Sequence, residues 1–166
     1  LEQVKFLQEI GFKRVVLARE LSLEEIKYIV DNADVEIEVF IHGALCVSVS
    51  GQCLMSLSIG SRSANKGECA QPCRMKYKLY DSKDNKLEDT YLLSKKDIYG
   101  LDILKDIMES NITSLKIEGR NKTPEYVAYV TSRYRKYIDL YIEKKKFDLD
   151  NEEQKNLLQM FNRSGK

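Results

Sequence analysis

The chain has 166 residues, of which 43% are hydrophobic and 32% charged, and its formal net charge is +1. These values are typical of one folded globular domain, and the balanced charge neither supports nor excludes a nucleic-acid partner. No apolar run approaches the length of a transmembrane helix and no signal peptide opens the chain, so no membrane partner and a cytoplasmic location are expected. Both ends interrupt helical patterns, which indicates a fragment of a longer protein.

The first part of the chain is predicted to alternate helices with strands. Apolar spacing indicates a helix over residues 1–10, and the apolar run at 14–18 is typical of a buried parallel strand. Ser22 and Glu25 form a capping-box pattern that begins a second helix. Residues 36–41 alternate carboxylate and apolar side chains, which predicts the second strand.

The alternation resumes after a segment rich in cysteine, serine and glycine. We expect a cysteine loop over residues 43–74 and an antiparallel hairpin over 75–93, with 90–93 as the third strand of the main sheet. The elements expected after the hairpin are a helix over 97–108, a strand over 114–117, a long helix that begins at Thr123 and Pro124, and a final helix over 150–161.

This order of elements predicts an α/β fold, namely the C-terminal half of a β/α (TIM-like) barrel with an inserted cysteine loop and β-hairpin. Residues 1–146 would form the partial barrel, and 147–166 a C-terminal helix that leads to a missing downstream region. Active sites of such barrels lie at the C-terminal ends of the strands, so polar strand ends and cysteine loop are expected to share one face. The polar strand-end residues are Arg19, Glu20, His42, Ser94, Lys95, Asp97, Glu118 and Arg120.

All the cysteines of the chain fall in one window, as C-x6-C followed by C-x3-C. Four thiolates are the usual ligands of a structural zinc ion or of an iron–sulfur cluster. The first spacing is too wide for a zinc knuckle, whereas clusters tolerate varied spacing, and disulfides do not suit a reducing cytosol. Arg74 follows the last thiol and would offset cluster charge. The candidate metal ligands are Cys46, Cys53, Cys69 and Cys73.

Three strand residues are candidate catalytic groups. His42 could act as a general acid or base or bind an anion, although a lone histidine at a strand end also suits a structural hydrogen bond. Glu38 shares one strand face with Glu36, and both are expected to point into the barrel mouth because carboxylates buried against helices would be costly. Glu118 stands at the end of the last strand, before Gly119.

Arginines at two strand ends are candidate substrate anchors. Arg120 could hold a carboxylate or phosphate bidentately, and Arg19 with its neighbour Glu20 would line the same mouth. A salt bridge between one of these arginines and Glu118 or Glu20 explains them equally well.

Other functions have weaker support in the residues. The tyrosines of the long helix follow core spacing, and its basic residues, with the run Lys144–Lys146, indicate RNA only weakly. Neither H-E-x-x-H nor G-x-S-x-G is present, so the common zinc and serine peptidase motifs are missing. A Cys46–His42 dyad would remove Cys46 from the metal site, and Ser48 or Ser50 with His42 has no evident third member. A structural zinc module is a further alternative.

Four segments of the chain carry a resemblance to a known family. Residues 38–56 closely resemble the signature of the collagenase-like peptidase family, peptidase family U32. Residues 62–74, 92–97 and 115–120 fit the same family, and the resemblance runs from about Val15 to Tyr141.

The resemblance implies a chemistry that differs from the family label. The label is protease or collagenase, but better-characterised members resemble hydroxylases that modify tRNA uridines, ribosomal RNA cytidine or a quinone precursor without molecular oxygen. In such members the four cysteines hold a 4Fe-4S cluster, and those acting on nucleic acid draw on prephenate as oxygen source. The resemblance therefore implies a cluster-dependent RNA hydroxylase, for which Arg19 and Arg120 would anchor the dicarboxylate. A crystal grown in air would hold zinc or no metal. A peptidase stays the alternative, and the oligomeric state is not indicated.

Overall fold

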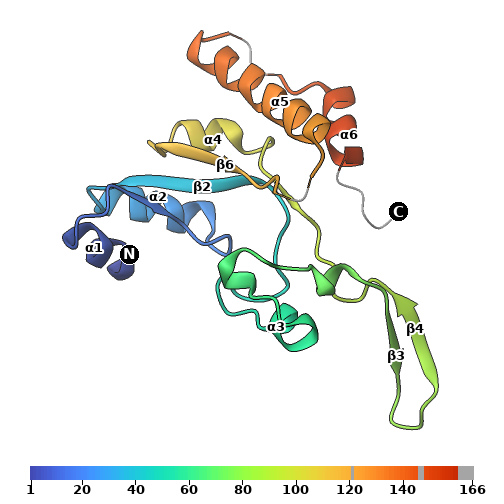
Figure 1. Cartoon of the computed structure of the whole chain (residues 1–166). Coiled ribbons are helices and arrows are strands. Elements are labelled where there is room, and N and C mark those ends of the chain that lie inside the picture. The colour runs from blue at the N-terminus through green and yellow to red at the C-terminus, as the bar shows by residue number, and fades with distance from the viewer. Residues whose placement is uncertain (121, 146–147, 161–166) are drawn as a thin grey trace. The chain divides into compact units, whose positions relative to one another are not determined.

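A computed structural model describes residues 1–120, 122–145 and 148–160. The chain divides into two compact units (Figure 1). The sheet unit comprises Leu1–Ala44 and Asp97–Lys166, and the cysteine unit comprises Leu45–Lys96. In the described part of the chain, no helix is long and apolar enough to cross a lipid bilayer.

The sheet unit is built around one long strand, β2 (Glu36–Gly43). β1 (Arg14–Val16) and β6 (Ser114–Ile117) pair with β2 in parallel, as the alternating pattern predicts. The two-residue strand β5 (Ile98–Tyr99) pairs with the end of β2 in the antiparallel sense. The α/β class is therefore confirmed, but the described strands do not close into a barrel, and a half-barrel is not established.

Two elements predicted between the hairpin and β6 are wrong. Residues 91–94 form a turn and loop after the hairpin and supply no third parallel strand. The helix expected over 97–108 is shortened to α4 (Leu104–Met108), because Ile98 and Tyr99 pair with β2 instead. An apolar run of this length suits a helix or a strand, and the pairing partner decides between them.

Two helices of the sheet unit begin where the sequence predicts their N-terminal caps. Ser22 accepts a hydrogen bond from the Glu25 amide, and the Glu25 side chain accepts one from the Ser22 amide, so the capping box begins α2. Thr123 caps α5 by accepting from the Tyr126 amide. Gly11, with φ of +95°, follows the end of α1. The bounds are α1 Glu2–Glu9, α2 Leu23–Asn32, α5 Pro124–Ile142 and α6 Asn151–Met160.

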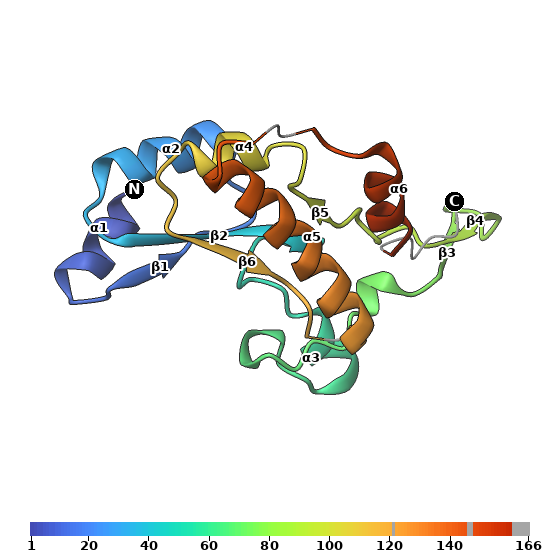
Figure 2. The same ribbon diagram turned by 90° about the horizontal axis from the view of Figure 1, so that it is seen from above.

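The core lies on one face of β2. Ile37, Val39 and Ile41 are almost fully buried and belong to one apolar cluster with residues of α2, α4 and α5. Figure 2 shows these helices alongside the strands. Glu36 and Glu38 alternate with the core residues and therefore lie on the opposite face. The two carboxylates thus avoid the face that packs against the helices, whereas their pointing into a barrel mouth stays a prediction.

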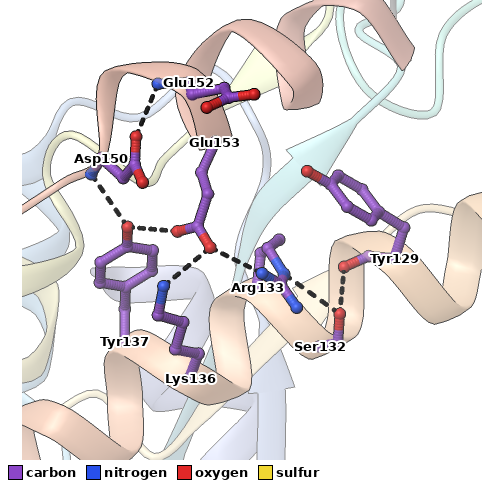
Figure 3. A network of polar contacts seen from close by, with 8 residues as sticks. All are labelled: Tyr129, Ser132, Arg133, Lys136, Tyr137, Asp150, Glu152 and Glu153. Carbon is purple, nitrogen blue, oxygen red and sulfur yellow. Dashed lines mark hydrogen bonds and ion pairs between the residues drawn. The ribbon is translucent and has the colours of Figure 1, made fainter.

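Helix α6 is held against α5 by one carboxylate (Figure 3). Glu153 accepts hydrogen bonds from Arg133 at 2.6 Å, Lys136 at 2.7 Å and the Tyr137 hydroxyl at 2.6 Å. Tyr137 also accepts from the Asp150 amide at 3.1 Å, next to the start of α6. Two basic residues of α5, which the sequence indicates only weakly as RNA contacts, are thus engaged inside the unit. Phe161 and Lys146, parts of the predicted final helix and basic run, lie outside the described residues.

We expect Glu153→Gln to loosen α6 at neutral pH. Burial would raise the pKa of Glu153, but the hydrogen bonds from Lys136, Tyr137 and Arg133 outweigh it and lower the pKa to about 2. The unfolded carboxyl titrates near 4.5, so its stabilisation is complete above that pH and is lost as the pH falls towards 2. The substitution should cost about 2 kcal/mol at pH 7 and less at pH 3, measured by hydrogen exchange of α6 amides. Equal protection in both proteins at pH 7 would contradict this.

The cysteine unit contains short helices and a hairpin. The predicted hairpin is confirmed, since β3 (Tyr77–Tyr80) pairs in the antiparallel sense with β4 (Lys86–Thr90). In its turn, Asp81 accepts from the backbone amides of Lys83 and Asn85, the Asx geometry that turn residues favour. The helical elements of the unit are α3 (Met55–Gly60), η1 (Ala64–Lys66) and η2 (Pro72–Arg74).

Candidate metal centre and strand-end residues

The four predicted metal ligands all lie in the cysteine unit. Cys46 follows the start of the unit, Cys53 precedes α3, Cys69 lies between η1 and η2, and Cys73 lies within η2. All four are half-buried free thiols, and no disulfide joins them. In this segment, which the structure describes throughout, short helices and turns carry these positions, with no strand before β3.

The thiols lie near enough to influence one another electrostatically. Burial raises the pKa of Cys73, Arg74 partly offsets this, and the neighbouring Cys46, Cys69 and Cys53 raise the pKa further. Among the described residues, however, no group of three or more potential ligands meets the geometry of a single metal ion. The unit therefore holds four cysteines whose charges influence one another, but the described side chains form no site for a single metal ion.

The sulfur of Cys69 accepts two hydrogen bonds. The Ser56 hydroxyl donates to Cys69 Sγ at 3.6 Å, and the Gln71 amide donates to it at 3.3 Å. Ser56 is almost fully buried and also accepts from the Ala70 amide at 3.1 Å. Sequence reasoning missed Ser56, because a serine in a serine-rich segment gives no sign that it will be buried.

Arg74 joins segments from the beginning and the end of the cysteine unit. Its guanidinium donates to the Leu45 carbonyl at 2.7 Å, to Ser94 Oγ at 3.0 Å and to the Lys95 carbonyl. Ser94 and Lys95, expected at the end of a parallel strand, lie instead in the loop that Arg74 binds. The charge of Arg74 also partly offsets the rise that burial causes in the pKa of Cys73, and its role in offsetting cluster charge stays a prediction.

His42 lies in the interior of the sheet unit. Its side chain is fully buried, its Nδ1 lies 3.0 Å from the Tyr134 hydroxyl, and its ring contacts those of Tyr99 and Tyr126. Tyr134 also donates to the Ile41 carbonyl at 3.0 Å, which ties α5 to β2. This environment favours the structural hydrogen-bonding role that the sequence left open, and a catalytic role stays a prediction.

We expect His42 to remain neutral in the folded protein down to about pH 4. Burial, and secondarily the charge of Lys122, lowers its pKa to about 3. The unfolded imidazole protonates near 6.5, so acidification below that value favours unfolding, and the stability contributed by the neutral ring is complete above it. Because the chain has one histidine, its NMR titration is assigned without ambiguity. A midpoint near 6.5 in the folded protein would contradict the expectation.

The charged strand-end residues pair with one another. Arg19 forms an ion pair with Glu118 at 3.1 Å and stacks over the Phe40 ring at 3.9 Å. Glu118 also accepts from the Arg120 amide at 3.3 Å. The salt-bridge alternative is therefore realised between Arg19 and Glu118. Glu20 and Arg120 are exposed in the loops that follow β1 and β6.

Glu38 lies on β2, between the flanking strands β1 and β6. It accepts from the Lys116 ammonium at 2.8 Å and from the Ser114 hydroxyl at 2.8 Å, with Arg14 at 3.8 Å. The hydrogen bonds from Lys116 and Ser114 lower its pKa despite partial burial. An ionised carboxylate held in this way is suited to fixing strand register or to binding a cation, and less to donating a proton near neutral pH.

The structure adds one charged pair that sequence reasoning missed. Lys122 lies 3.8 Å from Asp97, with both side chains largely buried, and its ammonium lies 4.7 Å from the Tyr126 ring centroid. Asp97 was expected at a strand end, but no local pattern links it to Lys122. The fold closes a separation of 25 positions (122 minus 97) to bring the two together.

The family model described as peptidase family U32 matches residues 1–166. The chain belongs to peptidase family U32. Among its relatives in that family, it is 44% identical over 145 residues to the 23S rRNA 5-hydroxycytidine C2501 synthase of Escherichia coli, covering 87% of this chain and 22% of that protein. The tRNA hydroxylation protein P1 of Bacillus subtilis is 44% identical over 83% of this chain and 34% of its own length.

Other U32 relatives carry peptidase names. The Collagenase of Porphyromonas gingivalis is 39% identical over 142 residues, covering 76% of this chain and 34% of that protein. The chain thus spans between 22% and 34% of the length of these three relatives. No solved structure matches the chain significantly.

Proposed function

We propose that this U32 chain carries the cluster-binding region of an iron–sulfur-dependent enzyme that hydroxylates tRNA or rRNA without molecular oxygen. The observation that carries the proposal is the gathering of four free thiols in one compact unit, where the pKa of Cys73 responds to the other three. Two relatives are named for rRNA or tRNA hydroxylation, which supports RNA as the substrate class.

The donor set fits a 4Fe-4S cluster better than a zinc ion. Four thiolates are the ligand set of such a cluster, and each binds a different iron, so their sulfurs lie farther apart than around one zinc. The support for a cluster is the type and number of the ligands, four free thiols within one compact unit. When bound, the cluster would supply one-electron chemistry. Cys46, Cys53, Cys69 and Cys73 would hold it, and Arg74 would keep the unit closed around it.

Substrate binding is proposed for the strand ends of the sheet unit. Arg19 and Arg120 are the proposed anchors for the carboxylates of prephenate. Arg19 is already paired with Glu118 at 3.1 Å, so a ligand carboxylate would have to replace Glu118 there. Glu38 is ionised and pairs with Lys116 at 2.8 Å and with Arg14 at 3.8 Å, so these two cations offset its charge on this face.

A peptidase is the second candidate, favoured by the family description and by the relative named Collagenase. A peptidase that pairs a nucleophile with histidine needs an imidazole that accepts a proton near neutral pH. His42 is the one histidine, is fully buried and has a pKa lowered to about 3. This environment disfavours both a Cys46–His42 dyad and a serine–His42 pair.

The deciding experiment is metal analysis of protein purified without oxygen, followed by an anaerobic hydroxylation assay on tRNA and rRNA with prephenate. We expect about four irons and as much sulfide per chain, and a hydroxylated nucleoside detected by mass spectrometry. One zinc per chain would favour the structural zinc module. A metal-free protein that cleaves collagen or peptides would favour the peptidase.

A further inference from the structure

We propose that Ser56 is a positioning residue that sets the reduction potential of the cluster through a hydrogen bond to Cys69. The inference rests on the proposed function and deepens it, since it assigns different roles to the four ligands. Its basis is the pair of hydrogen bonds that the Cys69 sulfur accepts, from the Ser56 hydroxyl and from the Gln71 amide.

The Ser56 hydroxyl is oriented by its surroundings. Ser56 lies in the first turn of α3 and is 2% exposed. Its oxygen accepts the Ala70 amide proton at 3.1 Å, and its own proton is then directed at Cys69 Sγ, 3.6 Å away. The buried hydroxyl therefore both accepts and donates a hydrogen bond, and these two bonds fix its orientation toward the Cys69 sulfur.

The second donor is built into the backbone. Gln71 has φ of +58°, in the left-handed region that residues other than glycine rarely adopt. This turn points the Gln71 amide back at the sulfur two residues earlier, at 3.3 Å, and Pro72 then begins η2. Within the described residues, hydrogen bonds to sulfur reach Cys69 and none of the other three cysteines.

The physical effect of such bonds has a definite sign. One-electron reduction adds a negative charge to the cluster and its thiolates, and donors aimed at a ligand sulfur stabilise that added charge. Hydrogen bonds to the sulfurs are therefore among the factors that raise the potential of iron–sulfur clusters. Removing the Ser56 hydroxyl should shift the potential to a more negative value, with the four ligands unchanged.

The test compares Ser56→Ala with Ser56→Thr, which keeps the hydroxyl, in protein purified without oxygen. Ser58→Ala is the matched control, because Ser58 lies on the same helix, is exposed and donates to the Leu54 carbonyl. The readout is the midpoint potential, from a redox titration followed by electron paramagnetic resonance. At the wild-type midpoint, the ratio of reduced to oxidised cluster should fall about fivefold in Ser56→Ala, the equivalent of one modest hydrogen bond. It should stay unchanged in Ser58→Ala and largely recover in Ser56→Thr.

The possible failures are distinguishable. Wild-type protein without iron and sulfide would overturn the proposed function and this inference together. A cluster whose midpoint is the same in Ser56→Ala and wild type would overturn this inference alone. If Ser56→Ala does not retain a cluster, its midpoint potential cannot be compared with that of the wild type. Electron–nuclear double resonance of the reduced wild type and of reduced Ser56→Thr, each in H2O and D2O, then takes the place of that comparison. An exchangeable proton coupled to the cluster whose coupling changes in Ser56→Thr would support the inference, and its absence would overturn it.

Discussion

Replacing Cys73 by alanine should abolish the proposed cluster and the proposed hydroxylation of RNA. Cys73 is a half-buried free thiol next to Arg74, and its pKa is raised by burial and, less strongly, by the other three thiols. Its loss would leave the proposed cluster with three cysteine ligands. Iron and sulfide should fall several-fold from about four per chain. Activity should fall by at least about 100-fold, because even the loss of an outer partner of a metal site costs about 10 to 100-fold.

The control for this replacement is Ser48→Ala. Ser48 lies in the same segment, between Cys46 and Cys53, and is one of the two serines that could act as a nucleophile with His42. We expect it to retain cluster and activity. If Ser48→Ala lost peptide hydrolysis while Cys73→Ala hydrolysed peptides as fast as the wild type, the proposed function would be wrong. That result would support a serine peptidase.

Replacing Gly43 by alanine should strongly destabilise the sheet unit. Gly43 ends β2 with φ of +120°, and a Cβ there would lie 2.5 Å from Glu118 Cβ and 2.7 Å from the Glu118 carbonyl oxygen. Both atoms belong to Glu118, whose backbone is fixed beside β2 because its amide donates to the His42 carbonyl at 2.8 Å. Overpacking and left-handed backbone together should cost about 4 kcal/mol, measured by urea denaturation.

Alanine substitutions at two other glycines distinguish backbone strain from overpacking as the cause of the stability lost in Gly43→Ala. Gly11 has φ of +95° but open space around its Cβ position, so Gly11→Ala should cost only about 1 kcal/mol from the backbone. Gly60 has neither a positive φ nor a neighbour within 4 Å, so Gly60→Ala should be neutral or slightly stabilising. A loss at Gly43 no larger than at Gly11 would contradict the close approach of β2 and β6.

The elements that local chemistry specifies were predictable from the sequence. Ser22 with Glu25 and Thr123 with Pro124 begin helices because their side chains and ring geometry act on the backbone within one turn. The hairpin turn follows from Asp81 in the same way. The third parallel strand and the helix start at Asp97 were predicted wrongly. Ile98 and Tyr99 become a strand only by pairing with the end of β2.

The candidate site also combines features that the sequence predicts with contacts that only the fold reveals. The spacing of four cysteines indicates a shared ligand site from the sequence alone, since ligand type and number are local properties of the chain. The hydrogen bonds of Ser56 to Cys69 and of Arg74 to Leu45 and Ser94 are invisible there, because they join residues 13 to 29 positions apart.

The family, the α/β class, most helix starts and the set of four candidate cysteine ligands can all be inferred from the amino-acid chain without coordinates. The burial of His42 in its neutral form, the pairing of Arg19 with Glu118 and the choice of Cys69 as the hydrogen-bonded sulfur required the folded arrangement. The physical reason is the range of the interactions. Capping, turn geometry and ligand chemistry act within a few residues, whereas burial and ion pairing depend on which distant segments the fold brings into contact.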